Sequence, residues 1–334
     1  MKKLLVQIPC LNEEINIKAV IESIPRSIPG FERVDVLLID DGSSDNSVTE
    51  AIDAGVDVVI SAQSTRGLAQ TFELGLEFSL AEGYDVMVNT DGDNQYYQDK
   101  IPLLIKPIAD GLSDIVIGDR VTSSLSHFSR GKKIFQSLGS LILGAASNVR
   151  IRDGASGFRA YSRFAMSKLF IATKFSYAME VLIQAGNKGL AITHVSTGAK
   201  RVARPSRLFR SSWQHVRLSS EAIISSFLLH RPGVLFGALS LILALGGTYP
   251  FLRYLILILN GTKGDNIQSL ILGVILLIGS FLCAALAVIA QLLKRSRELK
   301  EFSMSEKRLE GKPLQTVLEA RGYALIHDIR VQKN

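Results

Sequence analysis

The sequence has few cysteines: only Cys10 and Cys283 occur among its 334 residues. Cys283 lies inside a long apolar run, so the two thiols cannot form the disulfide framework that holds small secreted domains together. We therefore expect the more polar first two thirds of the chain in a reducing compartment.

Two further features are missing near the start of the chain. Lys2 and Lys3 are followed by an apolar stretch that Pro9 and Glu13 interrupt too early for a signal peptide, so we expect a first β-strand at 4–8. No G-x-G-x-x-G motif follows this strand. Its absence excludes a soluble oxidoreductase that binds a dinucleotide in the usual way.

The formal charge of +7 comes without any nucleic-acid-binding signature. Instead, the basic residues flank two apolar runs at 233–258 and 267–291, each long enough to cross a bilayer. The flanking clusters are Lys200, Arg201, Arg204, Arg207, Arg210 and Arg217 before the first run, and Lys294, Arg295, Arg297 and Lys300 after the second. Basic residues beside membrane spans favour the cytoplasmic side and anionic headgroups. We therefore predict an integral membrane protein and no nucleic-acid partner.

Four segments follow from these patterns. Residues 1–206 are expected to form the catalytic domain, 232–293 two transmembrane helices and 294–334 a peripheral cytoplasmic tail. Residues 207–231 show apolar side chains at helical spacing. Such a helix lies in the membrane interface or packs like any other amphipathic helix, and the pattern leaves both interpretations open.

The first 200 residues alternate short apolar runs with helical patterns, which predicts an α/β fold with an open, largely parallel sheet. The expected strands are 4–8, 34–39, 56–61, 86–90, 115–118 and 192–195, and the expected helices are 14–23, 67–82, 131–147 and 178–188. Polar clusters follow four of the strands, at 9–13, 40–45, 91–95 and 118–120. In such sheets ligands bind beyond the carboxyl ends of the strands, so these clusters predict an active site there.

The segment Asp91-Gly92-Asp93 directly follows an apolar strand. Two carboxylates at this spacing can hold a divalent cation and the ribose of a nucleotide, and Gln95 adds a neutral oxygen ligand. Alone, such a motif is more typical of a structural turn. The segments Pro9-Cys10-Leu11-Asn12-Glu13 and Asp40-Asp41-Gly42-Ser43-Ser44-Asp45 follow the first two strands and strengthen the functional interpretation. There, Asp41 is expected to bind the base and Glu13 the ribose.

Together with Arg66-Gly67-Leu68, Gly118-Asp119-Arg120 and Ser156-Gly157-Phe158-Arg159, this ordered set resembles the family 2 glycosyltransferases, in particular those that act on polyprenyl phosphates. The resemblance covers about residues 4–210. It implies a GT-A fold with a Rossmann-like nucleotide-sugar-binding domain, inversion at the anomeric carbon and a Mg²⁺ or Mn²⁺ cofactor. Leu11 stands where members often have tyrosine, which puts stacking on the base in doubt.

Carried over residue by residue, the resemblance implies three groups of site residues. The nucleotide-sugar would contact Pro9, Leu11, Glu13, Asp41, Asp91, Gly92 and Arg120. The metal would be held by Asp91, Asp93 and Gln95, and the residues nearest the chemistry would be Asp91, Asp93 and Asp153. The acceptor phosphate would meet Arg130, Arg159 and Arg204, although each of these cations could equally be solvated.

The predicted reaction is inverting transfer of a sugar from a nucleotide-sugar to a polyprenyl (dolichyl or undecaprenyl) phosphate at the cytoplasmic face of a prokaryotic plasma or inner membrane. An ionised phosphate is already a nucleophile, so Asp153 and Glu180 would orient groups rather than remove a proton. The alternatives are transfer to another membrane lipid or glycan, and a catalytically dead scaffold, which the intact acidic residues disfavour. A Gln-x-x-Arg-Trp motif is missing, which disfavours a processive polysaccharide synthase. Self-association into a homo-oligomer is left open.

Overall fold

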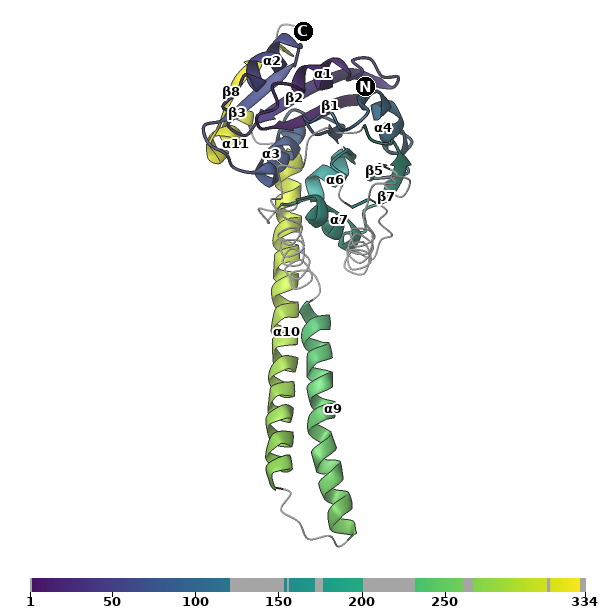
Figure 1. The fold of residues 1–334 in the computed structure, drawn as a ribbon, viewed down its shortest axis with the longest axis vertical. Coiled ribbons are helices and arrows are strands. Elements are labelled where there is room, and N and C mark those ends of the chain that lie inside the picture. Colours follow the sequence, from purple (N-terminus) through teal and green to yellow (C-terminus); the bar gives the residue numbers. More distant parts are fainter. Residues whose placement is uncertain are drawn as a thin grey trace. The chain divides into compact units, whose positions relative to one another are not determined.

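A computed structural model describes residues 2–120, 153–154, 156–171, 177–200, 232–260, 267–310 and 313–330 (Figure 1). The chain divides into two compact units. Unit 1 comprises Met1–Ile223 and Glu301–Asn334, and unit 2 comprises Ile224–Lys300.

Unit 1 contains an eight-stranded mixed sheet with the strand order β7-β5-β6-β4-β1-β2-β3-β8. The strands are β1 (Lys2–Cys10), β2 (Phe31–Asp40), β3 (Val58–Ala62), β4 (Val86–Asn89), β5 (Ile115–Asp119), β6 (Arg159–Ser162), β7 (Ile192–Ser196) and β8 (Tyr323–Asp328). Parallel pairing joins β1 to β2 and β4, β2 to β3, and β5 to β7. The six expected strands and the largely parallel sheet are therefore confirmed.

Two strands run against the others and were not expected. The short strand β6 pairs antiparallel with both β4 and β5, and β8 pairs antiparallel with β3. Residues 294–334 were expected to form a peripheral tail, whereas β8 adds an edge strand to the sheet of unit 1. The sequence YALIHD of β8 is too short, and its apolar residues alternate too little, to indicate which strand it pairs with.

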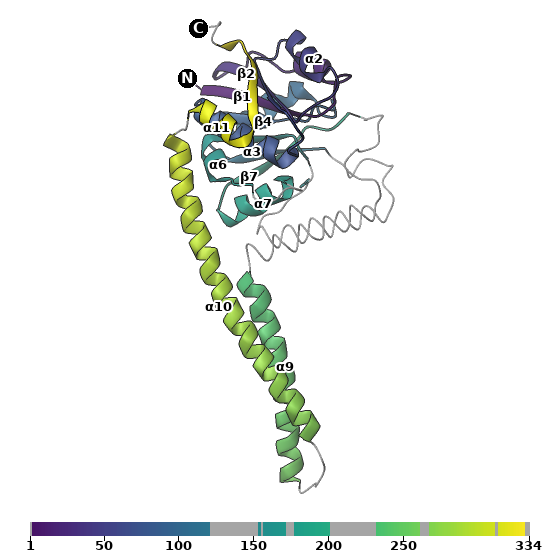
Figure 2. The same cartoon turned by 90° about the vertical axis from the view of Figure 1, so that its left-hand side faces the viewer.

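The helices of unit 1 pack against this sheet (Figures 1 and 2). They are α1 (Ile17–Glu22), α2 (Ser47–Asp53), α3 (Leu68–Ala81), the 3₁₀ helix η1 (Gln98–Lys100), α4 (Ile101–Ala109), α6 (Arg163–Lys168), α7 (Tyr177–Asn187) and α11 (Leu314–Arg321). The expected helices at 14–23, 67–82 and 178–188 correspond to α1, α3 and α7. The expected helix at 131–147 lies outside the described residues.

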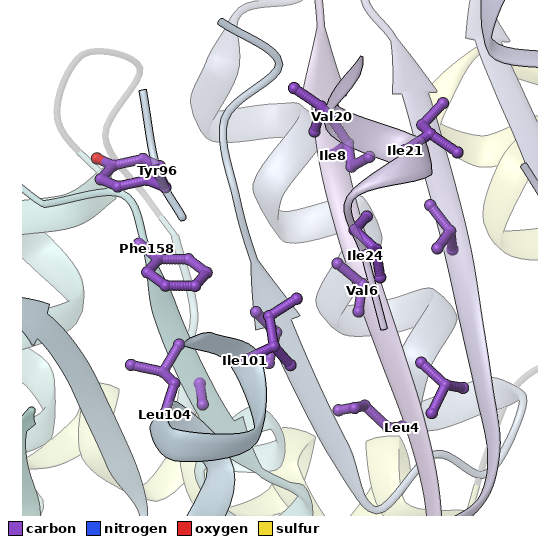
Figure 3. Close-up of a cluster of buried hydrophobic side chains, with 14 of the residues drawn as sticks. Leu4, Val6, Ile8, Val20, Ile21, Ile24, Tyr96, Ile101, Leu104 and Phe158 are labelled. Carbon is purple, nitrogen blue, oxygen red and sulfur yellow. The ribbon is translucent and has the colours of Figure 1, made fainter. Parts of the chain in front are cut away.

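The core of unit 1 explains why the central strands are almost uniformly apolar. Leu4, Val6 and Ile8 of β1 have no exposed surface. Figure 3 shows these three side chains together with those of α1 and α4, including Val20 and Ile101. A strand covered on both faces cannot alternate with polar residues, so polar chemistry is confined to its ends. The carboxyl ends of β1, β2, β3 and β4, which we call the carboxyl edge, are therefore where polar groups gather.

Unit 2 contains α9 (Pro232–Leu259) and most of α10 (Ile267–Glu310). Both helices are long and apolar enough to cross a membrane, and most of their apolar side chains are not buried within the protein. Ser240 and Ser280 exchange hydrogen bonds between each hydroxyl and the other residue's carbonyl, both 2.9 Å long. A Cβ at Gly247 would lie 3.0 Å from the Gly273 carbonyl oxygen, so small residues permit this close approach. Residues 207–231, expected to be amphipathic, lie outside the described residues.

Candidate functional site

The carboxyl end of β2 places Asp41 in a loop that binds backbone amides. Asp41 is buried, and its carboxylate accepts hydrogen bonds from the N–H groups of Arg66 at 2.7 Å and Gly67 at 2.8 Å. Burial raises the pKa of Asp41, although these amides act in the opposite direction. The carboxylate therefore joins the β2 loop to the turn that precedes α3.

The loops after β1 and β2 are tied together by side-chain to backbone hydrogen bonds. The amide of Asn12 donates to Ser43 Oγ at 2.9 Å, and the amide of Ser44 donates to Asn12 Oδ1 at 2.8 Å. Asn12 has a φ of 56°, a left-handed conformation that asparagine tolerates better than most residues. The amide of Glu13 also donates to Ser47 Oγ at 2.7 Å. These bonds fix Glu13 at the start of the loop while its carboxylate accepts from Asn16 Nδ2 at 3.0 Å.

Asp91 and Gly92 follow β4 and lie beside the β1 loop. A Cβ built on Gly92 would lie 3.6 Å from both Glu13 Cγ and the Pro9 carbonyl oxygen. A Cβ on Gly157 would lie 2.6 Å from Asp91 Oδ2, which is too close for any side chain. The expected residues Pro9, Glu13, Asp91 and Gly92 are thus brought together, with Gly157 packed against them.

The two carboxylates of the motif share one electrostatic environment. Burial, reinforced by the negative charge of Asp93, raises the pKa of Asp91 from 3.8 to about 6, although Tyr96, Arg120 and Arg159 counteract it. Asp93 Oδ1 accepts a hydrogen bond from the Gln95 amide at 3.0 Å. Two carboxylates that repel each other are a donor set that a divalent cation stabilises.

A metal held here would be only partly ligated by protein. In the described part of the chain, no group of three or more His, Cys, Asp and Glu side chains is arranged to hold an ion. Mg²⁺ usually binds one or two carboxylates and completes its shell with substrate phosphates and water. Asp91 and Asp93 fit this type of site, and their neighbour Gln95 offers a further oxygen.

Arg120 and Asp153 form a bidentate ion pair beside this motif. Arg120 Nε and one terminal nitrogen each donate to a carboxylate oxygen of Asp153 at 2.8 Å. Burial raises the pKa of Asp153, but the hydrogen bonds and charge of Arg120 outweigh it and hold this pKa below its ordinary value. Asp153 is therefore ionised and engaged, which suits a positioning group better than a base.

Lys200 holds the loop that contains Asn94 and Gln95. Its ammonium donates to Asn94 Oδ1 at 2.6 Å and lies 5.5 Å from the centre of the Tyr97 ring. Its amide also donates to the Gln95 carbonyl at 2.8 Å. Asn94 has a φ of 57°, so this loop adopts a tight conformation that Lys200 stabilises.

The three arginines expected at the acceptor phosphate differ in how far the structure describes them. Arg130 and Arg204 lie outside the described residues. Arg159 is fully buried and donates to the carbonyls of Gly154 and Ala178, both at 2.8 Å. These bonds connect β6 to the Asp153–Gly154 turn and to α7. Contact of Arg159 with an acceptor stays a prediction.

Sequence reasoning did not single out several residues that shape this site. The Tyr96 hydroxyl accepts the Gly157 amide at 2.8 Å, and its ring stacks on Phe158 with centroids 5.2 Å apart (Figure 3). Asn89 donates to the Gly157 carbonyl at 2.8 Å. Tyr96 and Asn89 flank the Asp91 motif in sequence, which is the only local signal that pointed to them. Leu11, which was expected to contact the nucleotide, is 39% exposed.

Comparison with known proteins gives this geometry a family context. Residues 5–170 match the profile of a family described as Glycosyl transferase family 2. A dolichyl-phosphate hexose transferase of Haloferax volcanii is 30% identical over 188 residues, which cover 55% of this chain and 77% of that protein. A polyprenol monophosphomannose synthase of Mycolicibacterium smegmatis is 23% identical over 205 residues, covering 58% and 76%.

A solved structure shares the fold. Glucosyl-3-phosphoglycerate synthase from Mycobacterium tuberculosis, crystallised with Mn²⁺, uridine diphosphate and glucosyl-3-phosphoglycerate, superposes with a TM-score of 0.51. The match has 24% sequence identity and covers 68% of this chain and 79% of that one. The sheet and its covering helices are thus those of the GT-A glycosyltransferase fold, as expected.

Proposed function

The chain belongs to glycosyl transferase family 2, and from this premise we propose that it transfers a sugar from a nucleotide-sugar to a polyprenyl phosphate with inversion at the anomeric carbon. The observation that carries the proposal is the convergence of Glu13, Asp41, Asp91 and Asp93 at the carboxyl edge of the sheet. The two relatives described above are named for transfer to such lipid phosphates.

The donor nucleotide would lie across the loops that follow β1, β2 and β4. Asp41, fixed by the amides of Arg66 and Gly67, would face the base, and Glu13, whose amide is held by Ser47, would face the ribose. Pro9 and Leu11 form the adjoining wall, and the lack of a side chain on Gly92 lets the pyrophosphate approach the backbone.

Asp91, Asp93 and Gln95 would hold Mg²⁺ or Mn²⁺, which supplies Lewis-acid stabilisation of the charge that develops on the departing nucleoside diphosphate. The positive charge of Arg120 lowers the pKa of Asp91, so Arg120 lies close enough to act on charge beside Asp91. The bidentate pair with Asp153 holds the guanidinium in one orientation. Charges fixed before the reaction need no reorganisation when the glycosidic bond breaks.

The acceptor is proposed to be a phosphate monoester because no strong general base is needed for an ionised oxygen nucleophile. Asp153, the acidic residue expected near the chemistry, is already engaged by Arg120. A neutral lipid hydroxyl would require a free base instead. Arg130 and Arg204 are proposed to bind the acceptor phosphate, as arginine does in charge-assisted pairs.

Membrane attachment would bring the site to its lipid. We propose that α9 and the apolar part of α10 cross the bilayer, since both are long enough and mostly unburied. The basic residues on either side of this pair favour a cytoplasmic location for unit 1.

The test is direct transfer by the full-length protein in detergent. Labelled nucleotide-sugars are incubated with undecaprenyl phosphate, dolichyl phosphate or diacylglycerol, and the extracted lipid is analysed for label and anomeric configuration. We expect label only on the polyprenyl phosphates, with the anomeric configuration of the sugar inverted.

Arg130→Ala and Arg204→Ala should each weaken acceptor use by about 1.5–3 kcal/mol, the usual value of a charged hydrogen bond. Nucleotide binding should be unchanged. If the label were found on diacylglycerol instead, the proposed acceptor would be wrong, but the family assignment would stand.

A further inference from the structure

The turn between α11 and β8, at residues 321–323, lies at the carboxyl edge of the sheet although it is far from β3 in the sequence. Because β8 runs antiparallel to β3, its first residue pairs with the last residue of β3: Tyr323 lies opposite Ala62. The loop that follows Ala62 leads to Arg66 and Gly67, whose amides bind Asp41. The α11–β8 turn therefore lies beside the proposed nucleotide end of the site.

Gly322 contacts the side chain of Arg66. A Cβ built on Gly322 would lie 2.3 Å from a terminal nitrogen of Arg66 and 3.1 Å from its Cζ. Gly322 also ends α11 with a φ of 69°, a left-handed conformation that favours glycine. The absence of a side chain thus allows the guanidinium to lie directly on the backbone of this turn.

Tyr323 places the turn close to Asp41. Its side chain is buried, and its hydroxyl has no hydrogen-bond partner among the described residues. Burial and then the charge of Asp41 raise the pKa of Tyr323 to about 12, while Arg66 lowers it. Tyr323 therefore interacts electrostatically with both Asp41 and Arg66, which places it in one cluster with them.

The turn is held in place by ion pairs with α3, the helix that begins immediately after Gly67. Arg321 donates to both carboxylate oxygens of Glu77, at 2.6 and 2.9 Å, and to Gln70 Oε1 at 3.0 Å. Arg308 pairs with Glu73 and with Glu77. Figures 1 and 2 both show α11 beside α3. These contacts fix the turn relative to Arg66 and Asp41.

We propose that the α11–β8 turn is a wall of the donor-nucleotide site, in which Gly322 positions the Arg66 guanidinium toward the bound nucleotide. Arg66 is an exposed cation beside a carboxylate that is proposed to face the base, so its orientation affects how tightly the nucleotide binds. This inference rests on the proposed donor site. The proposal assigns a role in substrate binding to α11 and β8, which follow the two apolar helices in the sequence.

The experiment measures binding of UDP, GDP, CDP and dTDP with Mn²⁺ to full-length protein in detergent by titration calorimetry. Gly322→Ala should weaken the nucleotide that the parent binds by at least about tenfold, equivalent to about 1.4 kcal/mol. The KM for the nucleotide-sugar should rise to a similar degree, while kcat at saturating donor changes little. In an Arg66→Ala background, Gly322→Ala should have no further effect, because it acts through Arg66.

Gly189→Ala is the matched control. Gly189 has the same φ of 69°, but a Cβ there would meet nothing within 4 Å. It therefore reproduces the backbone strain without the contact and should bind nucleotide like the parent. If Gly322→Ala does not fold, Gly322→Asn replaces it, since asparagine tolerates this conformation and still carries a Cβ.

Three results would overturn the inference: parental binding in Gly322→Ala or Gly322→Asn, equal losses in Gly189→Ala, or an undiminished effect of Gly322→Ala without Arg66. These results leave the proposed function intact. If the parent bound none of the four nucleotides, the donor site itself would be wrong and this inference with it.

Discussion

Gly157 packs directly against Asp91, so that a Cβ at position 157 would lie 2.6 Å from Asp91 Oδ2 and 2.8 Å from Oδ1. The Gly157 backbone is held on both sides, because its amide donates to the Tyr96 hydroxyl and its carbonyl accepts from Asn89. The Gly157 backbone can therefore not move away easily from Asp91. This glycine gives the Asp91 carboxylate the space it occupies.

Gly157→Ala should displace the Asp91 carboxylate and lower kcat/KM on the order of 100-fold, because small displacements of a catalytic group are costly. The melting temperature should change little, which would separate loss of activity from loss of folding. Gly279→Ala is the control, since its Cβ would make an ordinary contact at 3.6 Å with Leu243. Parental activity in Gly157→Ala would show that Asp91 does not need this position.

Asp93→Ala should reduce transfer by at least about 100-fold, because charge on the departing nucleoside diphosphate would lose its stabilisation. Chelation by EDTA should inactivate the parent, and added Mn²⁺ or Mg²⁺ should restore it. Asp99→Ala serves as control, because the Asp99 side chain is 66% exposed and pairs only loosely with Lys100, at 3.9 Å. Full activity in EDTA would reject the metal assignment.

Lys200→Ala should release the Asn94–Gln95 segment and lower kcat/KM about tenfold, which corresponds to about 1.4 kcal/mol. The cause is loss of the ammonium hydrogen bond to Asn94 and of its contact with Tyr97. A higher Mn²⁺ concentration should be needed for half-maximal activity. Lys106→Ala, which removes an exposed helix-surface pair with Asp110, should leave both quantities unchanged.

Asp153→Asn should change the pH dependence of stability. The pKa of Asp153 is lowered in the folded protein, so its pair with Arg120 stabilises the fold fully above the unfolded value of 3.8. This contribution is lost as the pH falls through the lower folded value. The melting temperatures of parent and variant should therefore differ by a constant amount from pH 7 to about pH 5 and converge below about pH 4. A difference that widens in acid would contradict the pair's role.

The membrane topology can be tested by cysteine labelling. Thr262→Cys, placed between the two apolar helices in a chain carrying Cys283→Ser, should react with an impermeant thiol reagent only from the non-cytoplasmic side. The reason is that the basic residues flanking the helix pair favour the cytoplasm. Labelling only from the cytoplasmic side would reverse the proposed layout.

Local patterns in the sequence were sufficient for the parallel strands of the sheet and for both apolar helices. The runs that became β1, β2 and β4 are apolar because both faces of these strands are covered, and this pattern can be read without knowing the neighbours. The position of Asp91 directly after β4 likewise follows from the chain itself. The carboxyl ends of adjacent parallel strands meet at one edge, so the grouping of Asp41 with Asp91 could be predicted.

Tertiary structure alone decided the contacts between distant segments. Arg120 pairs with Asp153 across 33 residues, Lys200 reaches Asn94 across 106, and Arg321 meets Glu77 across 244. Each depends on how a turn orients one side chain, for which charge and spacing along the chain give no signal. The pairing of β8 with β3 is a further example, because a short edge strand has no apolar periodicity strong enough to name its partner. The sequence thus determined which residues end the strands, and packing determined which distant residues complete the site around them.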